Sequence, residues 1–164
     1  MFKDKALWLL FFLTLFSDQF SKIVAVSNLF EGERIPVLEG LFNFTLVYNP
    51  GAAFGMFAGL PDVQRRIALV FVSLVALLVV FYMMKETKED RPSQVALIAI
   101  LAGAVGNLID RFRYDGVVDF LDVYWGNYHW PAFNIADSAI SIGVGILMAR
   151  LLFTDLGQPQ PGET

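Results

Sequence analysis

Residues 93–112, SQVALIAILAGAVGNLIDRF, decide the fold class of this chain. The segment is long enough to cross a hydrocarbon core of about 30 Å, which takes about 20 helical residues. Three further apolar segments match it, at residues 6–26, 67–84 and 135–153. Charged residues make up only 17% of the chain, whereas a soluble domain carries about 25%. The sequence therefore predicts one integral membrane domain, residues 1–164, with four helical spans.

Polar residues interrupt the segment 93–112 along one helical face. Gly103, Asn107, Asp110 and Arg111 follow the spacing i, i+4, i+7 and i+8, so they lie on one side of a helix. A charged group inside a span costs about 2.5 to 3.5 kcal/mol, so it calls for a partner or a function. We expect this face to point into the bundle, where Asp110 and Arg111 either form a structural ion pair or brace a site.

The two longer connections are predicted to lie on the same side of the membrane. Residues 27–66 contain two strand-like runs, 34–38 and 42–48, which suit a small sheet resting on the membrane. Residues 113–134 contain a turn at 115–116, a strand-like run at 117–121 and an aromatic segment at 124–130. The fold class is thus a four-transmembrane-helix bundle with a small extracytoplasmic β-sheet, a cradle, between helices 1 and 2. A periplasmic loop or short helix is expected between helices 3 and 4, and a disordered tail at 156–164.

Composition excludes several kinds of chemistry. The chain has no cysteine, so thiolate nucleophiles and sulfur-bound metals are absent. A Ser-His-Asp triad or a zinc site would rest on the single histidine, His129, which lies among aromatic residues and suits an interfacial or structural role better. No basic cluster indicates nucleic acid as a partner. Carboxylates remain as the chemical groups, with no cofactor and no metal expected.

Asp119 and Asp137 are the two carboxylates that the local sequence sets apart. Asp119 lies in the apolar run 117–121, where desolvation would raise its pKa. Asp137 opens the fourth span, and its alternative role is helix capping with Asn134, worth about 1 kcal/mol. If the two meet, repulsion and burial keep one protonated and one ionised, as in aspartic proteases. Such a pair can activate water for attack on a peptide carbonyl.

A magnesium site is the alternative use of the same carboxylates. Asp110, Asp119, Asp122 and Asp137 together would offer the oxygen ligands that this cation prefers. Nothing in the sequence cradles the phosphate groups that usually accompany it.

The orientation and the first span each leave an alternative open. Lys and Arg number six on the terminus side and six on the other side, so the positive-inside rule ties, and Lys3 and Lys5 favour cytoplasmic termini. Residues 6–26 could also be a cleaved signal peptide, but the charged residues Asp18 and Lys22 interrupt the segment where such a peptide carries no charge. Asp18 and Lys22 are at i and i+4 and can form a salt bridge.

Five motifs, in order and spread over nearly the whole chain, resemble those of the bacterial lipoprotein signal peptidases, also called signal peptidase II. They are Asp18-Gln19-Phe20-Ser21-Lys22, Asn49-Pro50-Gly51-Ala52-Ala53-Phe54-Gly55, Gly103-Ala104-Val105-Gly106-Asn107-Leu108-Ile109-Asp110-Arg111, Val117-Val118-Asp119-Phe120 and Phe133-Asn134-Ile135-Ala136-Asp137.

The resemblance implies a four-helix inner-membrane enzyme with cytoplasmic termini and a site near the periplasmic face. The family removes signal peptides from diacylglyceryl-modified prolipoproteins, cutting on the amino side of the lipidated cysteine. By resemblance Asp119 and Asp137 are catalytic. The residues expected to order the site or support the substrate are Asp18, Lys22, Asn49, Gly51, Gly103, Asn107, Asp110, Arg111 and Asn134. The expected partners are these prolipoproteins and membrane lipids, with no obligate protein partner.

Two other classes of protein use intramembrane carboxylates. A small ion-coupled transporter is one, although four spans without an inverted repeat suit alternating access poorly. A structural subunit is the other, with the charged pairs serving only to hold helices together. The second class leaves Asp119 unexplained.

Overall fold

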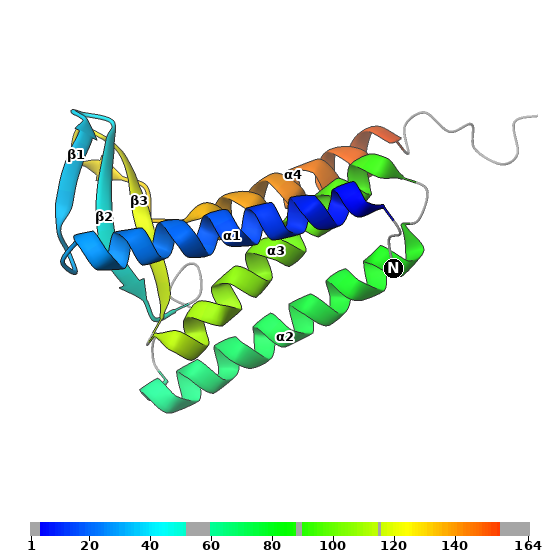
Figure 1. Cartoon of the computed structure of the whole chain (residues 1–164), viewed down its shortest axis with the longest axis horizontal. Helices are drawn as coiled ribbons and strands as arrows, with labels where there is room; N and C mark the ends of the chain where they lie inside the picture. The colour runs from blue at the N-terminus through cyan, green and yellow to red at the C-terminus, as the bar shows by residue number, and fades with distance from the viewer. Residues whose placement is uncertain (1–3, 52–59, 88–89, 115, 155–164) are drawn as a thin grey trace, which may run out of the picture.

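The computed structural model describes residues 4–51, 60–87, 90–114 and 116–154. Four long helices run side by side, and a sheet crosses one end of them (Figure 1). The helices are α1 (Lys5–Asn28), α2 (Asp62–Glu86), α3 (Arg91–Arg113) and α4 (Ile135–Thr154). All four are long and apolar enough to cross a membrane. The predicted tail 156–164, position 115 of the predicted turn and residues 52–55 of the second motif lie outside the described residues.

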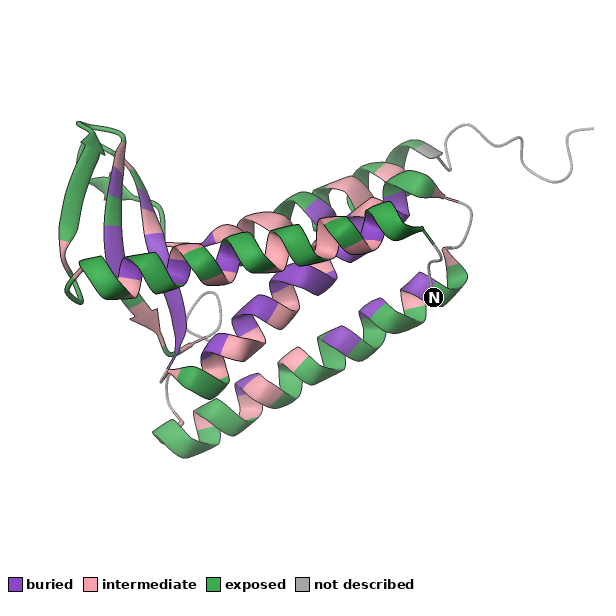
Figure 2. Cartoon of the chain, viewed as in Figure 1, coloured by how far each residue is buried: buried purple, intermediate pink, exposed green. Residues whose placement is uncertain are grey.

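Helix α3 forms the centre of the bundle. It packs against each of the other three helices, whereas α2, within the described residues, contacts α3 as its only neighbouring helix. In the most apolar stretch of α3, 50% of the residues are buried, against 17%, 22% and 11% in α1, α2 and α4. The outward faces of α2 and α4 therefore remain largely exposed in the isolated chain (Figure 2). In a bilayer, these faces would contact lipid.

Glycines on α3 and α4 allow the close approach of the helices. A Cβ atom on Gly103 would collide with the carbonyl oxygen of Ala136, and one on Gly106 would lie 2.5 Å from Asp18 Oδ2. On α4 the close contact is at Gly143, where a Cβ atom would lie 2.7 Å from the carbonyl oxygen of Ala96.

The sheet is antiparallel and joins both outward segments. Its four strands lie in the order β1 (Arg34–Leu38), β2 (Phe42–Asn49), β3 (Val117–Trp125) and β4 (Tyr128–His129). The small predicted sheet is confirmed. The predicted strand run 117–121 is part of β3, and the strands β3 and β4 stand where a loop or short helix was also expected. The strand run extends past Leu121 because β2 pairs with β3 as far as Phe42 opposite Val123.

The two ends of the bundle differ in chemistry. At the end away from the sheet, an apolar cluster joins α1, α2 and α3, with the fully buried residues Leu7, Met84, Leu97 and Ile98 among its members. At the sheet end, the buried residues include polar and charged side chains from α1, α3, β3 and the start of α4. The described chain ends both lie at the apolar end, opposite the sheet (Figure 1). The polar end is thus the place where the fold gathers chemical groups.

Candidate active site

Asn134 joins the two aspartates that the sequence sets apart. Its side-chain Nδ2 donates to Asp119 Oδ1 at 2.7 Å, and its backbone N–H donates to Asp137 Oδ2 at 3.3 Å. The backbone N–H of Asp137 in turn donates to Asn134 Oδ1 at 2.8 Å. Asn134 therefore caps α4 as predicted, and the same residue also holds the carboxylate of strand β3 beside that helix start.

Two further amides hold the remaining carboxylate oxygens. Asn107 Nδ2 donates to Asp137 Oδ1 at 2.7 Å, and Asn49 Nδ2 donates to Asp119 Oδ2 at 3.0 Å. Each aspartate thus receives a hydrogen bond on both oxygens, which fixes the carboxylate planes. Asp119 is almost completely buried, at 2% exposure, whereas Asp137 is partly open. The pair is accessible mainly from the Asp137 side.

The environment of Asp119 disfavours the ionised form of its carboxyl group. Burial, first, and the charge of Asp137, second, raise the pKa of Asp119 from 3.8 to about 7. Hydrogen bonds from Asn49 and Asn134 favour the ionised form but do not outweigh these two effects. Burial therefore favours the protonated form of Asp119 up to about neutral pH.

Wild-type stability in detergent is expected to fall as pH rises from about 4 to about 7. In this range the folded state keeps a proton on Asp119 that the unfolded state has lost, so raising the pH favours unfolding by up to a few kcal/mol. Asp119→Asn removes this titration. Its Tm, followed by intrinsic tryptophan fluorescence, should lack that fall. If Tm falls equally with pH in wild type and in Asp119→Asn, Asp119 is not the titrating group.

A buried ion cluster lies beneath the aspartates. Lys22 Nζ lies 2.9 Å from Asp18 Oδ2, which confirms the predicted i, i+4 pair. Lys22 Nζ also lies 2.8 Å from Asp110 Oδ2. Of the two roles predicted for Asp110 and Arg111, a structural ion pair or bracing of the site, the structure favours the second, because Asp110 pairs with Lys22. Arg111 Nη1 instead donates to the carbonyl oxygen of Asn107 at 3.1 Å.

Gln19 is a site residue that the sequence prediction missed. Its Nε2 donates to Asp18 Oδ2 at 3.1 Å, to the carbonyl oxygen of Gly106 at 3.2 Å and to Asp110 Oδ1 at 3.2 Å. The signal was its polarity inside a membrane span, next to Asp18. Gly51 contributes through its backbone, since its N–H donates to Asn49 Oδ1 at 3.1 Å and so orients that amide toward Asp119.

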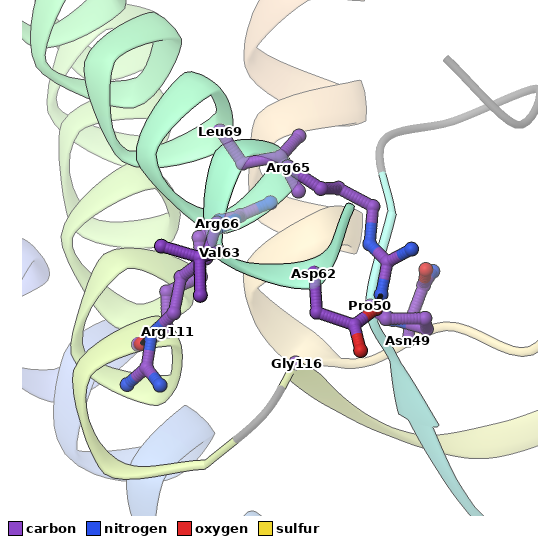
Figure 3. Close-up of a pocket in the computed structure, with 9 residues that line it drawn as sticks. All are labelled: Asn49, Pro50, Asp62, Val63, Arg65, Arg66, Leu69, Arg111 and Gly116. Atoms are coloured by element: carbon purple, nitrogen blue, oxygen red, sulfur yellow. Dashed lines mark hydrogen bonds and ion pairs between the residues drawn. The ribbon is translucent and has the colours of Figure 1, made fainter. Parts of the chain in front are cut away.

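A cavity of about 310 Å³ opens beside these residues, between the start of α2 and the end of β2 (Figure 3). Asn49 and Arg111 link its wall to the site. Arg65 reaches across from α2 toward Asn49 and forms an ion pair with Asp62 at 2.5 Å (Figure 3). The cavity, which Asn49 connects to Asp119 by its hydrogen bond, has both charged and apolar residues in its wall and is large enough to hold part of a peptide chain.

Asp122 and His129 lie apart from this site, on the sheet. Asp122 accepts a hydrogen bond from Asn43 Nδ2 at 2.9 Å and lies 2.8 Å from His129 Nδ1. Burial opposes ionisation of Asp122, but the bonds from His129 and Asn43 outweigh it and lower its pKa. The His129 ring stacks on Tyr124 at 4.9 Å. His129 thus has a structural role in the described sheet.

The four carboxylates considered for magnesium do not converge. Asp110 is bound to Lys22, and Asp122 to His129 and Asn43. Among the residues that the structure describes, no group of three histidine, aspartate or glutamate side chains has the spacing to hold a metal ion. What the geometry links, through Asn134, is the pair Asp119 and Asp137. Such a pair can supply both a general base and a general acid.

Comparison with known proteins identifies the family. Residues 10–153 match the family model of signal peptidase (SPase) II. A lipoprotein signal peptidase of Syntrophus aciditrophicus is 49% identical over 141 residues, covering 85% of this chain and 88% of the relative. A lipoprotein signal peptidase of Desulforapulum autotrophicum is 50% identical over 137 residues, covering 83% of this chain and 85% of the relative.

Solved structures agree with the sequence comparison. The chain superimposes on a bacterial membrane enzyme with a TM-score of 0.86 and 29% identity, covering 99% of this chain and 96% of that one. A second bacterial membrane enzyme gives a TM-score of 0.81 at 30% identity, covering 93% of this chain and 96% of that one. The chain therefore belongs to the signal peptidase II family of membrane peptidases.

Proposed function

We propose that this protein is an intramembrane aspartyl endopeptidase that removes signal peptides from diacylglyceryl-modified prolipoproteins. The cut lies on the amino side of the lipidated cysteine. The observation that carries the aspartyl mechanism is the double attachment of Asn134, which binds the side chain of Asp119 and the start of α4 at Asp137. The substrate class follows from the relatives, which are named lipoprotein signal peptidases.

The chemistry needs only the two carboxyls and a water molecule. The ionised carboxylate takes a proton from water as the water oxygen attacks the peptide carbonyl carbon. The protonated carboxyl donates to the developing oxyanion, which a buried site stabilises more strongly than bulk water does. When the C–N bond breaks, the cysteine nitrogen receives a proton from the pair. The products are a signal peptide with a new carboxyl end and a lipoprotein with a free amino group.

The proposed location is the bacterial inner membrane, with both termini in the cytoplasm and the site near the periplasmic face. Lys3 and Lys5 favour cytoplasmic termini, and the structure supports a site on the side opposite the termini. The described chain ends lie at one end of the bundle and the sheet lies at the other (Figure 1). The site residues Asp119 and Asn49 belong to that sheet, so a substrate lipidated at the outer face would meet them there.

Purified protein is expected to cleave a diacylglyceryl-modified prolipoprotein in mixed micelles and to leave the unlipidated form of the same chain intact. Mass spectrometry of both products locates the cut, which should lie directly before the lipidated cysteine. EDTA should not change the rate. Equal cleavage of both substrate forms would refute the proposed specificity, and inhibition by EDTA that added Mg²⁺ reverses would refute the metal-free mechanism.

A further inference from the structure

The Lys22 ammonium group lies between two carboxylates deep in the bundle. Its distances to Asp18 Oδ2 and Asp110 Oδ2 are 2.9 Å and 2.8 Å. All three residues are at most 1% exposed. We call Asp18, Lys22 and Asp110 the Lys22 bridge. It joins α1 to α3, and none of its members hydrogen-bonds directly to Asp119 or Asp137 in the described contacts.

Each carboxylate of the bridge also holds a backbone N–H group next to an aspartate of the site. Asp18 Oδ1 accepts from the N–H of Ala136 at 2.9 Å, and Ala136 directly precedes Asp137. Asp110 Oδ2 accepts from the N–H of Val118 at 3.1 Å, and Val118 directly precedes Asp119. One cation therefore links the backbone of β3 to the backbone of α4 through two matching carboxylate contacts.

Lys22 makes a third contact that points toward the same pair. Its Nζ donates to Asn107 Oδ1 at 3.0 Å. With its oxygen held by a cation, the Asn107 side chain must present Nδ2 on its other side, where it donates to Asp137 Oδ1 at 2.7 Å. The ammonium group, together with Asn134 Nδ2, which donates to the same oxygen at 3.3 Å, thus selects the orientation of the amide that binds Asp137.

Stability alone does not explain this arrangement. Replacing a buried ion group by apolar residues of similar volume is often neutral or stabilising, since desolvation offsets the attraction between the charges. A charged bridge does, however, impose defined distances and directions on the groups that it joins. The bridge binds the backbone N–H group directly before Asp119 and the one directly before Asp137. A role in setting the distance between the two aspartates would explain these two contacts.

We propose that Lys22 is a positioning residue that sets the separation of Asp119 and Asp137 through the Lys22 bridge and orients Asn107 toward Asp137. This inference rests on the proposed function, because it concerns the geometry of the same aspartate pair. It assigns the bridge to the chemical step and not to substrate binding, so its loss should lower kcat and leave KM nearly unchanged.

Two variants separate positioning from folding. Lys22→Met leaves two buried carboxylates without a cation and is expected to unfold or to lose much of its stability. The triple variant Asp18→Asn, Lys22→Met, Asp110→Asn has no buried charge in the bridge, and its asparagine oxygens can still accept from Ala136 and Val118. We expect the triple variant to insert and fold, with kcat lowered about 100-fold, the usual cost of a misplacement of about 1 Å.

A matched control lies at the other end of the bundle. Arg150 Nη2 and Asp90 Oδ1 form an ion pair at 2.9 Å between α4 and the residue that precedes α3. The double variant Asp90→Asn, Arg150→Met removes a helix-joining ion pair far from the site. It should keep the wild-type kcat and KM.

The deciding measurement is kcat and KM of the triple variant in mixed micelles, with Tm from intrinsic tryptophan fluorescence as the test of folding. A folded triple variant with lowered kcat, unchanged KM and an unaffected control supports the positioning role. Wild-type kcat in the triple variant overturns it. If wild-type protein cleaves no lipidated substrate, or if Asp119→Asn retains turnover, the proposed function fails instead, and the two failures are thereby distinguished.

Discussion

Asp119→Asn and Asp137→Asn are each expected to lower kcat by at least about 1,000-fold, within the range of about 10² to 10⁴ that a positioned general acid or base contributes. An amide can neither take a proton from water nor return one to the leaving nitrogen. Either substitution therefore breaks the cycle, whichever member holds the shared proton at a given step. The change is nearly isosteric, and Tm from intrinsic tryptophan fluorescence identifies the folded variants, in which the loss comes from chemistry.

The matched control for this pair is Asp122→Asn. Asp122 is also a buried aspartate of β3, at 4% exposure, but it binds Asn43 and His129 and not the site. The rate of prolipoprotein cleavage should stay within about threefold of wild type in this variant, since the barrier changes by less than 1 kcal/mol. Retention of turnover in either Asp119→Asn or Asp137→Asn, in folded protein, would rule out the aspartate pair.

Asn134→Ala is expected to lower kcat by about 100-fold and to destabilise the protein. Asn134 is fully buried, and its side chain accepts from the N–H of Asp137 while donating to Asp119. Its removal leaves these buried groups short of partners, at a cost of about 1 to 3 kcal/mol in stability. It also frees the Asp119 carboxyl to rotate, and a displacement of about 1 Å costs about 100-fold in rate.

Asn43→Ala separates the two effects of Asn134→Ala. Asn43 of β2 is a buried amide that donates at 2.9 Å to Asp122, which lies on β3 as Asp119 does. Its loss should also lower Tm, but by less, because one described hydrogen bond of the Asn43 side chain is broken against four of the Asn134 side chain. Single-turnover rates of cleavage should then fall for Asn134→Ala only. An equal fall in both variants would mean that the rate reports on stability alone.

Several parts of the fold could be predicted because their causes are local. The four spans follow from length and apolar content, which hold for any rotation or tilt of a helix. The pair of Asp18 and Lys22 follows from the i, i+4 spacing alone. The strand runs 34–38 and 42–48 carry β-favouring residues next to turn residues, and β1 and β2 begin at the predicted positions.

The extent of β3 could not be predicted, because its cause lies in another segment. Asp122 interrupts the apolar run after Leu121 and suggests that the strand ends there. In the fold, Asn43 of β2 and His129 of β4 bind its carboxylate. The strand can therefore continue to Trp125, since the charge is stabilised by side chains that only the strand pairing brings near.

The sequence by itself determined the number of spans, the identity of the two proposed catalytic aspartates and the residue types that surround them. Tertiary structure decided which group each polar residue binds. Asp110 forms an ion pair with Lys22, which is 88 positions away in the sequence. Asp18 accepts a hydrogen bond from the N–H of Ala136, which is 118 positions away. The physical reason is that buried charges take the partner that helix rotation and close glycine packing bring within about 3 Å, and neither of these is encoded in local spacing.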